Sequence, residues 1–151
     1  MTIMSPAFVF GGMIPAKYTS DGSDISPPLR FCDVPPATQS LALVCDDPDA
    51  PGGTWVHWVL FNIPPNTKEL KEDWPTDGRL ADGSCHGVND FGSLGYGGPS
   101  PPSGTHRYRF TLYALDCELD LQPGCRRHDL ITAMRGHVLA EAQCMGQYRR
   151  R

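Results

Sequence analysis

The 151-residue sequence has no long apolar run and no export signal. None of its apolar stretches approaches the roughly 18 residues that a membrane-spanning helix needs. No basic residue precedes the modest apolar stretch at the N-terminus, as a secretory signal would require. We therefore expect a cytoplasmic protein with no integral membrane association.

Basic residues are also scarce. Only three of the 13 basic residues are lysines, 17 residues are acidic, and the net charge is −4. Nucleic-acid binding depends on a basic patch or stripe, and the three arginines at 149–151 are too few to form one. We interpret them as a solvated tail and expect no nucleic-acid partner.

Close cysteine pairs are absent as well. The six cysteines are widely spaced, and no two of them form a CxxC pair. In a chain without an export signal, this spacing predicts reduced thiols that are mostly buried. No cysteine stands in a recognisable order with a histidine and an acid, so none is assigned as a nucleophile.

Glycine and proline, in contrast, are abundant, with 16 and 15 residues. In a helix interior glycine costs about 1 kcal/mol and proline about 3 kcal/mol, so the composition excludes a helical bundle or a coiled coil. Turn clusters between short apolar runs over residues 1–36 are typical of an all-β domain. The length predicts one domain over residues 1–151.

Apolar patterning predicts three strands. Residues 40–45 and 55–62 are almost continuously apolar, as in strands that are buried on both faces. Residues 106–115 alternate over their first half. Between the last two strands, ten of the 22 residues from 83 to 104 are glycine or proline, which predicts an ordered, functional loop.

A helical period is confined to residues 126–142. We expect Gly136 to divide this stretch into two short helices. Residues 144–148 are then expected to return as a closing strand.

Side chains of a strand alternate between its two faces, so their positions decide which of them can meet. In the segment 55–62 this rule places His57 on one face with Trp55, Val59 and Phe61. A histidine inside so apolar a strand needs a polar partner.

The same rule places His106 and Tyr108 on one face, and Asp47 on the face of Leu43. If these strand ends converge with Trp55 and its neighbours, a carboxylate, two imidazoles, a phenol and an indole meet beside loops rich in glycine and proline. Such a set favours an anion, because protonated histidine, the tyrosine hydroxyl and backbone N–H groups all donate hydrogen bonds. Asp47 is expected to raise the pKa of a neighbouring histidine by stabilising its charged form.

The same residues leave other functions open. Two histidines and a carboxylate are also the ligand set of a facial-triad metal centre, which Cys85–His86 could extend. Either histidine could instead be the general base of a hydrolase. Against both alternatives, we find no activated serine or cysteine and no close metal-ligand spacing. Two roles are open for Asp49: it contributes to the site, or it caps its own turn.

Short motifs spread over nearly the whole chain carry a family resemblance. They are YTSDG (18–22), SPPL (26–29), SLAL (40–43), DPDAP (47–51), HW (57–58), NIP (62–64), GVNDFG (87–92), GYGGP (95–99), PP (101–102) and HRY (106–108). In this order they resemble the phosphatidylethanolamine-binding protein (PEBP) family, in particular its bacterial and archaeal branch, which is labelled Raf-kinase-inhibitor-like.

The resemblance implies a mainly β fold, a PEBP-like antiparallel β-sandwich with a few short peripheral helices and its main helical segment near 126–143. It also implies an anion pocket that needs no catalytic residue, metal or cofactor. A homodimer is implied as well, and the label of the branch implies regulation of a protein kinase.

The pocket residues of the family carry over onto ten positions of this chain. These are Asp47, Asp49, Pro51, Trp55, His57, Gly98, Pro101, Pro102, His106 and Tyr108. Many prokaryotic relatives have a cysteine where this chain has Ser100, so any role of that cysteine is absent here.

These observations predict a non-catalytic binding protein for a small anion: phosphate, a phosphorylated head group or a phosphopeptide. Two alternatives stay open. One is a hydrolase or a metal-dependent enzyme that uses His57, His106 and Asp47. The other is a protein inhibitor of kinases or serine proteases that acts through surface contacts.

Overall fold

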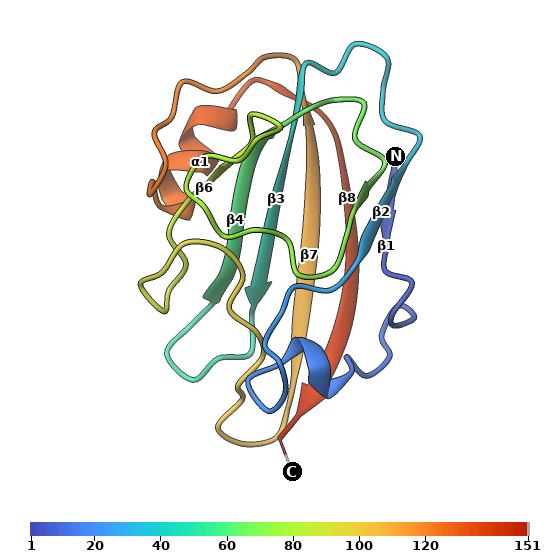
Figure 1. The fold of residues 1–151 in the computed structure, drawn as a ribbon, viewed down its shortest axis with the longest axis vertical. Coiled ribbons are helices and arrows are strands. Elements are labelled where there is room, and N and C mark those ends of the chain that lie inside the picture. The colour runs from blue at the N-terminus through green and yellow to red at the C-terminus, as the bar shows by residue number, and fades with distance from the viewer. Residues whose placement is uncertain (151) are drawn as a thin grey trace.

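The computed structural model describes residues 1–150, which form two antiparallel sheets and little helix (Figure 1). The larger sheet has the strand order β6-β4-β3-β7-β8, and the smaller has β1-β2-β5. The elements are β1 (Thr2–Met4), the 3-10 helix η1 (Ala16–Tyr18), β2 (Leu29–Cys32), β3 (Ser40–Asp47), β4 (Trp55–Ile63), β5 (Glu69–Leu70), β6 (Cys85–His86), β7 (Thr105–Leu115), α1 (Arg127–Met134) and β8 (Val138–Arg149). The predicted mainly β fold is confirmed.

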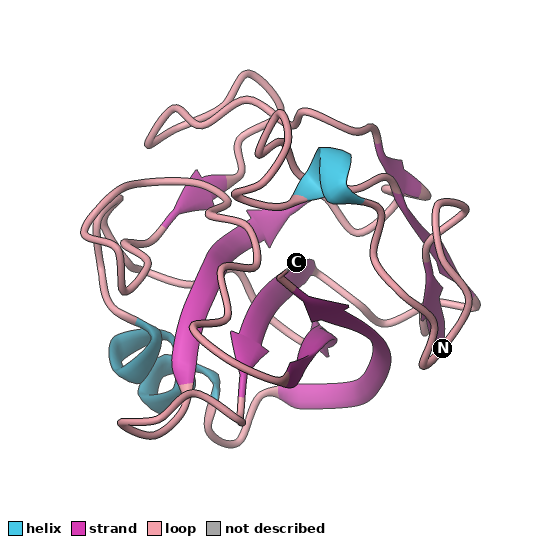
Figure 2. Ribbon diagram, turned by 90° about the horizontal axis from the view of Figure 1, so that it is seen from below, coloured by secondary structure: helices cyan, strands magenta, loops and turns pink. Residues whose placement is uncertain are grey.

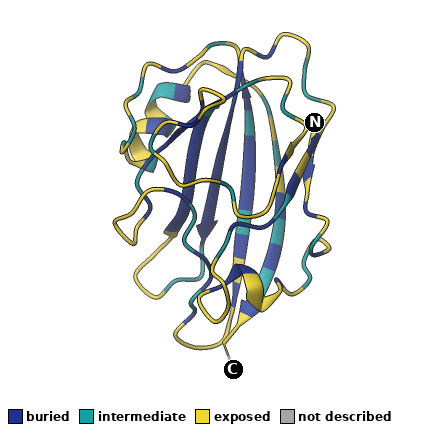
Figure 3. Ribbon diagram, in the orientation of Figure 1, coloured by how far each residue is buried: buried dark blue, intermediate teal, exposed yellow. Residues whose placement is uncertain are grey.

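The five-stranded sheet carries a core on each face. The inner face, which carries Leu43, packs against the small sheet, which contributes Leu29 to the same core. The outer face, which carries Val44, packs against α1, which contributes Leu130 to the second core. In Figure 3, β3 and β4 are accordingly dark blue over most of their length. This burial on both faces explains why the two central strands are almost continuously apolar in sequence.

The pairing of β3 with β4 shifts by one residue at His57. Cys45 lies opposite Trp58, and the next residue, Asp46, lies opposite Val56. His57 is therefore the extra residue of a β-bulge, which interrupts side-chain alternation along the bulged strand.

The bulge corrects the predicted faces of β4. Trp58 belongs to the inner core together with Tyr108. Val59 and Phe61 belong to the outer core beneath α1. The prediction that these two residues share a face with His57 is wrong, because the extra residue inverts the alternation beyond it.

A second shift occurs at the other end of β4, around Asn62. Its φ is +53°, in the left-handed region that asparagine tolerates better than most residues. The Asn62 amide donates to the carbonyl of Leu119 at 2.9 Å and accepts from its N–H at 2.8 Å. The chain that leaves β7 is thereby tied to the sheet.

The helix is shorter than predicted. α1 begins within one residue of the predicted segment 126–143 but ends at Met134. Gly136 follows with a φ of +80°, a left-handed conformation that commonly ends helices. Residues 138–143 are not a second helix but the first half of β8, because they pair with β7. The predicted closing strand 144–148 is the second half of β8.

The segment 83–104 closes the outer edge of β4. Two of its residues form β6, and beyond them the Val56 N–H donates to the Asp90 carboxylate at 2.7 Å. The Gly97 N–H donates to the carbonyl of His57 at 2.9 Å. These bonds satisfy backbone groups that an open edge would leave unpaired. The loop is thus ordered against β4, as predicted, and Figure 2 shows loops around the end of the large sheet that faces the viewer.

Two further observations concern the cysteines and the helices. All six cysteines are free thiols, and three of them are buried while Cys32 is exposed. Within residues 1–150, no helix combines the length and the apolar character that crossing a membrane takes.

Gly87 marks a close approach between the 83–104 loop and its neighbours. A Cβ at this position would lie 2.5 Å from the carbonyl oxygen of Cys125 and 2.8 Å from Cγ1 of Val59. Because a backbone oxygen cannot move aside alone, we expect Gly87→Ala to lower the free energy of unfolding by about 1–3 kcal/mol. Gly52→Ala is the control, since nothing lies within 4 Å of its Cβ. Urea unfolding that gives both variants wild-type stability would contradict this packing.

Candidate functional site

A cavity of about 210 Å³ lies where β3 ends and β4 and β7 begin. This is the lower end of the sheet in Figure 1, near the C-terminus. Eight of the ten predicted ligand-binding residues line it: Asp47, Pro51, Trp55, His57, Pro101, Pro102, His106 and Tyr108. Ala50, Phe91 and Ser100 line it as well. Ala50 and Ser100 are adjacent in sequence to predicted residues, and Phe91 lies in the GVNDFG motif of the 83–104 loop.

Asp47 is buried, and protein donors occupy both of its carboxylate oxygens. Oδ2 accepts a hydrogen bond from Nδ1 of His106 at 2.6 Å, and Oδ1 accepts one from the backbone N–H of Asp49 at 2.8 Å. Because a carboxylate only accepts, Nδ1 of His106 carries a proton. This leaves Nε2 of His106 for a ligand, as an acceptor when the ring is neutral and as a donor when it is protonated.

His57 is held in the same way by the backbone. Its Nδ1 lies 2.6 Å from the carbonyl oxygen of Gly97, which also only accepts, so Nδ1 carries a proton and Nε2 is left for a ligand. Burial lowers the pKa of His57 below its ordinary 6.5, and the Gly97 carbonyl and the charge of Asp47 oppose this only in part. Asp47 does raise the pKa of His57, as expected, but desolvation outweighs this effect and the net pKa is lowered.

Tyr108 adds a hydroxyl to the cavity wall. The side chain is 1% exposed, and its hydroxyl has no hydrogen-bond partner among residues 1–150. Burial, and after it the charge of Asp47, raise the pKa of Tyr108, so the group is a donor at neutral pH. A buried hydroxyl without a partner costs about 1–3 kcal/mol, and an acceptor on a ligand would remove that cost.

Two aromatic side chains of the cavity are partly exposed. Trp55 is 39% exposed and Phe91 is 49% exposed. Their rings meet edge to face with centroids 5.5 Å apart, and Phe91 also contacts the His57 ring at 5.3 Å. This pair offers an apolar surface beside the polar interior of the cavity.

Asp49 does not line the cavity. Its carboxylate accepts hydrogen bonds from the backbone N–H, Nε and Nη2 of Arg107 at 2.9, 3.0 and 2.8 Å. These bonds lower the pKa of Asp49 to about 2. Asp49 thus ties its loop to β7, and the sequence could not show this partner because it lies 58 residues away.

Gly98 does not line the cavity either, but it places the loop that does. Its N–H donates to the Asp24 carboxylate at 2.8 Å. A Cβ at Gly98 would lie 2.6 Å from the carbonyl oxygen of Tyr18, so a larger residue would push the loop away from η1. Its role is steric rather than one of ligand contact.

Ser100 is held by the C-terminal segment. Nη2 of Arg150 donates to Ser100 Oγ at 2.6 Å and to Ser20 Oγ at 2.9 Å, and Nε lies 3.3 Å from the Asp21 carboxylate. The predicted solvated tail is wrong at Arg150, which clamps a cavity-lining loop. Arg151 lies outside the described residues.

The facial-triad alternative does not find its ligand set here. Asp47, His57 and His106 do not bring three donor atoms within 4.8 Å of one another. The reason is local, because Nδ1 of His57 bonds to the Gly97 carbonyl while Nδ1 of His106 bonds to Asp47.

Cys85 and His86 do not extend the site. Both are buried in β6, and neither lines the cavity. Nε2 of His86 accepts a hydrogen bond from Trp58 Nε1 at 2.9 Å, and its Nδ1 donates to the Asp77 carbonyl at 2.8 Å. Both ring nitrogens are satisfied within the core, so His86 is a structural histidine.

Comparison with known proteins adds a family. The family model of the phosphatidylethanolamine-binding proteins matches residues 4–149. A UPF0098 protein of Methanothermobacter thermautotrophicus is 57% identical over 150 residues, which cover 99% of each chain. A PEBP homolog from Chlamydia trachomatis has a similar structure, with a TM-score of 0.92, 39% identity and coverage of 99% of this chain and 97% of that one. YbcL of Escherichia coli, a member of the mammalian PEBP family, has a TM-score of 0.90, 28% identity and coverage of 99% and 98%.

The lowered pKa of His57 predicts a pH dependence of stability. In the unfolded chain His57 takes up a proton near its ordinary pKa of 6.5, whereas the folded protein takes it up only at lower pH. The unfolded state therefore binds more protons, and the free energy of unfolding falls as the pH drops below about 6.5. We expect urea unfolding at pH 7 and pH 5 to show a smaller fall for His57→Gln than for the wild type. Equal falls would show that burial does not suppress the charge of His57.

Proposed function

Because this chain belongs to the phosphatidylethanolamine-binding protein family, we propose that it binds a small anion, above all a phosphate group, in the cavity between His57, His106 and Tyr108. One observation carries the proposal. After the bonds within the protein are counted, the cavity offers an unpartnered hydroxyl and two imidazole Nε2 atoms.

An anion fits these three groups better than a cation does. The Tyr108 hydroxyl is a donor in search of an acceptor. The one carboxylate of the wall, Asp47, already accepts two hydrogen bonds, so it supports His106 rather than offering an open site to a cation. An anion would further favour the protonated form of each imidazole, which turns Nε2 into a charged donor.

The dimensions of the cavity favour a small ligand or a small end of a larger one. Its volume of about 210 Å³ is below the roughly 300–1,000 Å³ of pockets that take drug-sized molecules. A phosphate would occupy the interior, and Trp55 and Phe91 would contact whatever group the phosphate carries. A phosphorylated head group and a phosphorylated peptide share this chemistry.

The cavity favours binding over catalysis. Ser100 is the one serine in its wall, and Ser100 Oγ accepts a hydrogen bond from Arg150 rather than donating to a histidine. A serine nucleophile needs an adjacent base. Regulation of a kinase and assembly as a homodimer, both implied by the resemblance, stay predictions.

Calorimetric titration with inorganic phosphate at pH 6 tests this proposal. We expect the wild type to bind and His57→Ala to bind at least about tenfold more weakly, because a hydrogen bond to a charged group contributes about 1.5–3 kcal/mol. His128→Ala, a change at an exposed histidine of α1, should bind like the wild type. Negligible binding by the wild type, or equal binding by His57→Ala, would contradict the proposal.

Tyr108→Phe separates a binding role from a structural one. It removes a hydroxyl that has no partner in the protein, so the free energy of unfolding without phosphate should stay unchanged or rise by up to about 1 kcal/mol. Phosphate affinity should nevertheless fall, by roughly two- to tenfold. A variant that loses stability but keeps its affinity would place the hydroxyl in the core rather than in the binding site.

A further inference from the structure

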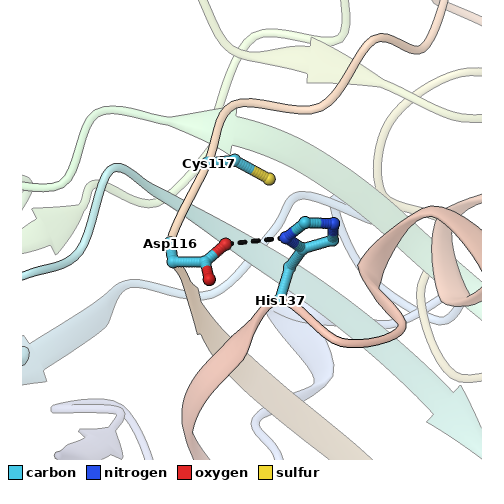
Figure 4. A group of neighbouring side chains, drawn as sticks. All are labelled: Asp116, Cys117 and His137. Carbon is cyan, nitrogen blue, oxygen red and sulfur yellow. Dashed lines mark hydrogen bonds and ion pairs between the residues drawn. The ribbon is translucent and has the colours of Figure 1, made fainter.

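Three side chains of different chemistry meet at the opposite end of the sheet. Asp116 and Cys117 follow the last residue of β7, and His137 precedes the first residue of β8. One carboxylate oxygen, the thiol and one imidazole nitrogen lie within 4.8 Å of one another. Figure 4 shows the carboxylate and the thiol both directed toward the imidazole ring.

The backbone that carries these groups is held from several sides. The N–H of Asp116 donates to the carbonyl of His137 at 3.0 Å, and Ser40 Oγ donates to the carbonyl of Cys117 at 2.6 Å. The N–H of His137 donates to the carbonyl oxygen of Met134, the last residue of α1, at 2.9 Å. A site built on such fixed backbone loses little conformational entropy when it takes a ligand.

We propose that Asp116, Cys117 and His137 bind a divalent metal ion of intermediate hardness, such as Zn²⁺. A thiolate, an imidazole and a carboxylate are each ordinary zinc ligands. Mg²⁺ and Ca²⁺ prefer oxygen ligands alone, so the thiol and the imidazole select against them.

The geometry is close to what zinc requires. Zinc–ligand distances of about 2.0–2.3 Å place two ligand atoms of one tetrahedral ion about 3.3–3.6 Å apart. The three donors lie within 4.8 Å of one another, so shifts of about 1 Å would bring them to these separations. Asp116 Oδ1 and His137 Nδ1 are 2.7 Å apart in a hydrogen bond, and they would move slightly apart as the ion replaces the Nδ1 proton. Three protein ligands leave the fourth tetrahedral position to water, as in sites where zinc keeps an open position.

The site is accessible and separate from the anion cavity. The side chains of Asp116 and His137 are 45% and 46% exposed, so an ion reaches them from solvent. β7 has 11 residues, which at about 3.4 Å each separate its two ends by more than roughly 30 Å. This inference therefore does not depend on the proposed anion binding.

A bound ion would connect the two ends of one chain segment. The ligands come from the chain that leaves β7 and the chain that enters β8, twenty residues apart, with α1 between them. Because binding would occur only in the folded state, the ion would raise the unfolding temperature.

Titration of the full-length, tag-free reduced protein with Co²⁺ tests the site. Co²⁺ is a spectroscopic substitute for Zn²⁺, and a cysteine ligand produces a thiolate-to-cobalt absorption band in the near ultraviolet. We expect this band to saturate at one Co²⁺ per chain, well below about 1 mM, and to disappear when Zn²⁺ is added. Zn²⁺ should raise the unfolding temperature of the same sample.

Variants assign the band to its ligands. Cys117→Ser should abolish the band. His137→Gln should weaken Co²⁺ binding by at least about tenfold, because losing even a residue that only hydrogen-bonds to a metal ligand lowers metal affinity by about 10–100-fold. Cys32→Ser, at an exposed cysteine outside the cluster, should leave both band and affinity unchanged. Circular dichroism of each variant confirms folding, and His137→Gln serves alone if Cys117→Ser does not fold. A band that is absent, that needs millimolar Co²⁺, that survives both cluster variants or that is lost with Cys32→Ser would overturn the proposal.

Discussion

The β-bulge at His57 joins the hydrophobic core to the candidate site. Without the extra residue, His57 and Trp58 would point to opposite faces of the sheet. With it, Trp58 packs into the inner core while His57, its neighbour in sequence, lines the cavity. The outer edge of β4 is hydrogen-bonded to the 83–104 loop, so the loop that forms part of the cavity wall is held by the strand that supplies the histidine.

The chemistry of the cavity follows from which groups the protein itself satisfies. Asp47 and the Gly97 carbonyl each bond to Nδ1 of one histidine. These acceptors orient the two rings and leave Nε2 of each for a ligand. Burial then lowers the pKa of His57, while the Tyr108 hydroxyl stays protonated and unpartnered. The cavity therefore holds one hydroxyl donor and two Nε2 atoms, which become charged donors when a bound anion favours the protonated imidazoles.

The features that depend on local sequence pattern could be predicted from the sequence. Alternation in the strand 106–115 correctly placed His106 and Tyr108 on one face, and the glycine and proline content identified the long loop. The prediction was wrong where contacts between residues far apart in sequence determine the structure. No local signal marks the bulge that inverts Val59 and Phe61, and the apolar period of 138–143 suits a helix as well as the strand that pairing with β7 selects. The sequence also could not show that Arg107 donates hydrogen bonds to Asp49. Nor could it show that burial affects the pKa of His57 more than the nearby carboxylate does.

If the cavity holds an anion through its protonated imidazoles, binding must bring protons to the protein. Sulfate is the best probe of this uptake, because sulfate keeps its charge through neutral pH and does not itself take up the protons. Calorimetry at pH 7 in two buffers of different ionisation enthalpy measures that number. We expect net proton uptake on sulfate binding, and less of it in His57→Gln. Binding with no proton uptake, or with proton release, would contradict the account.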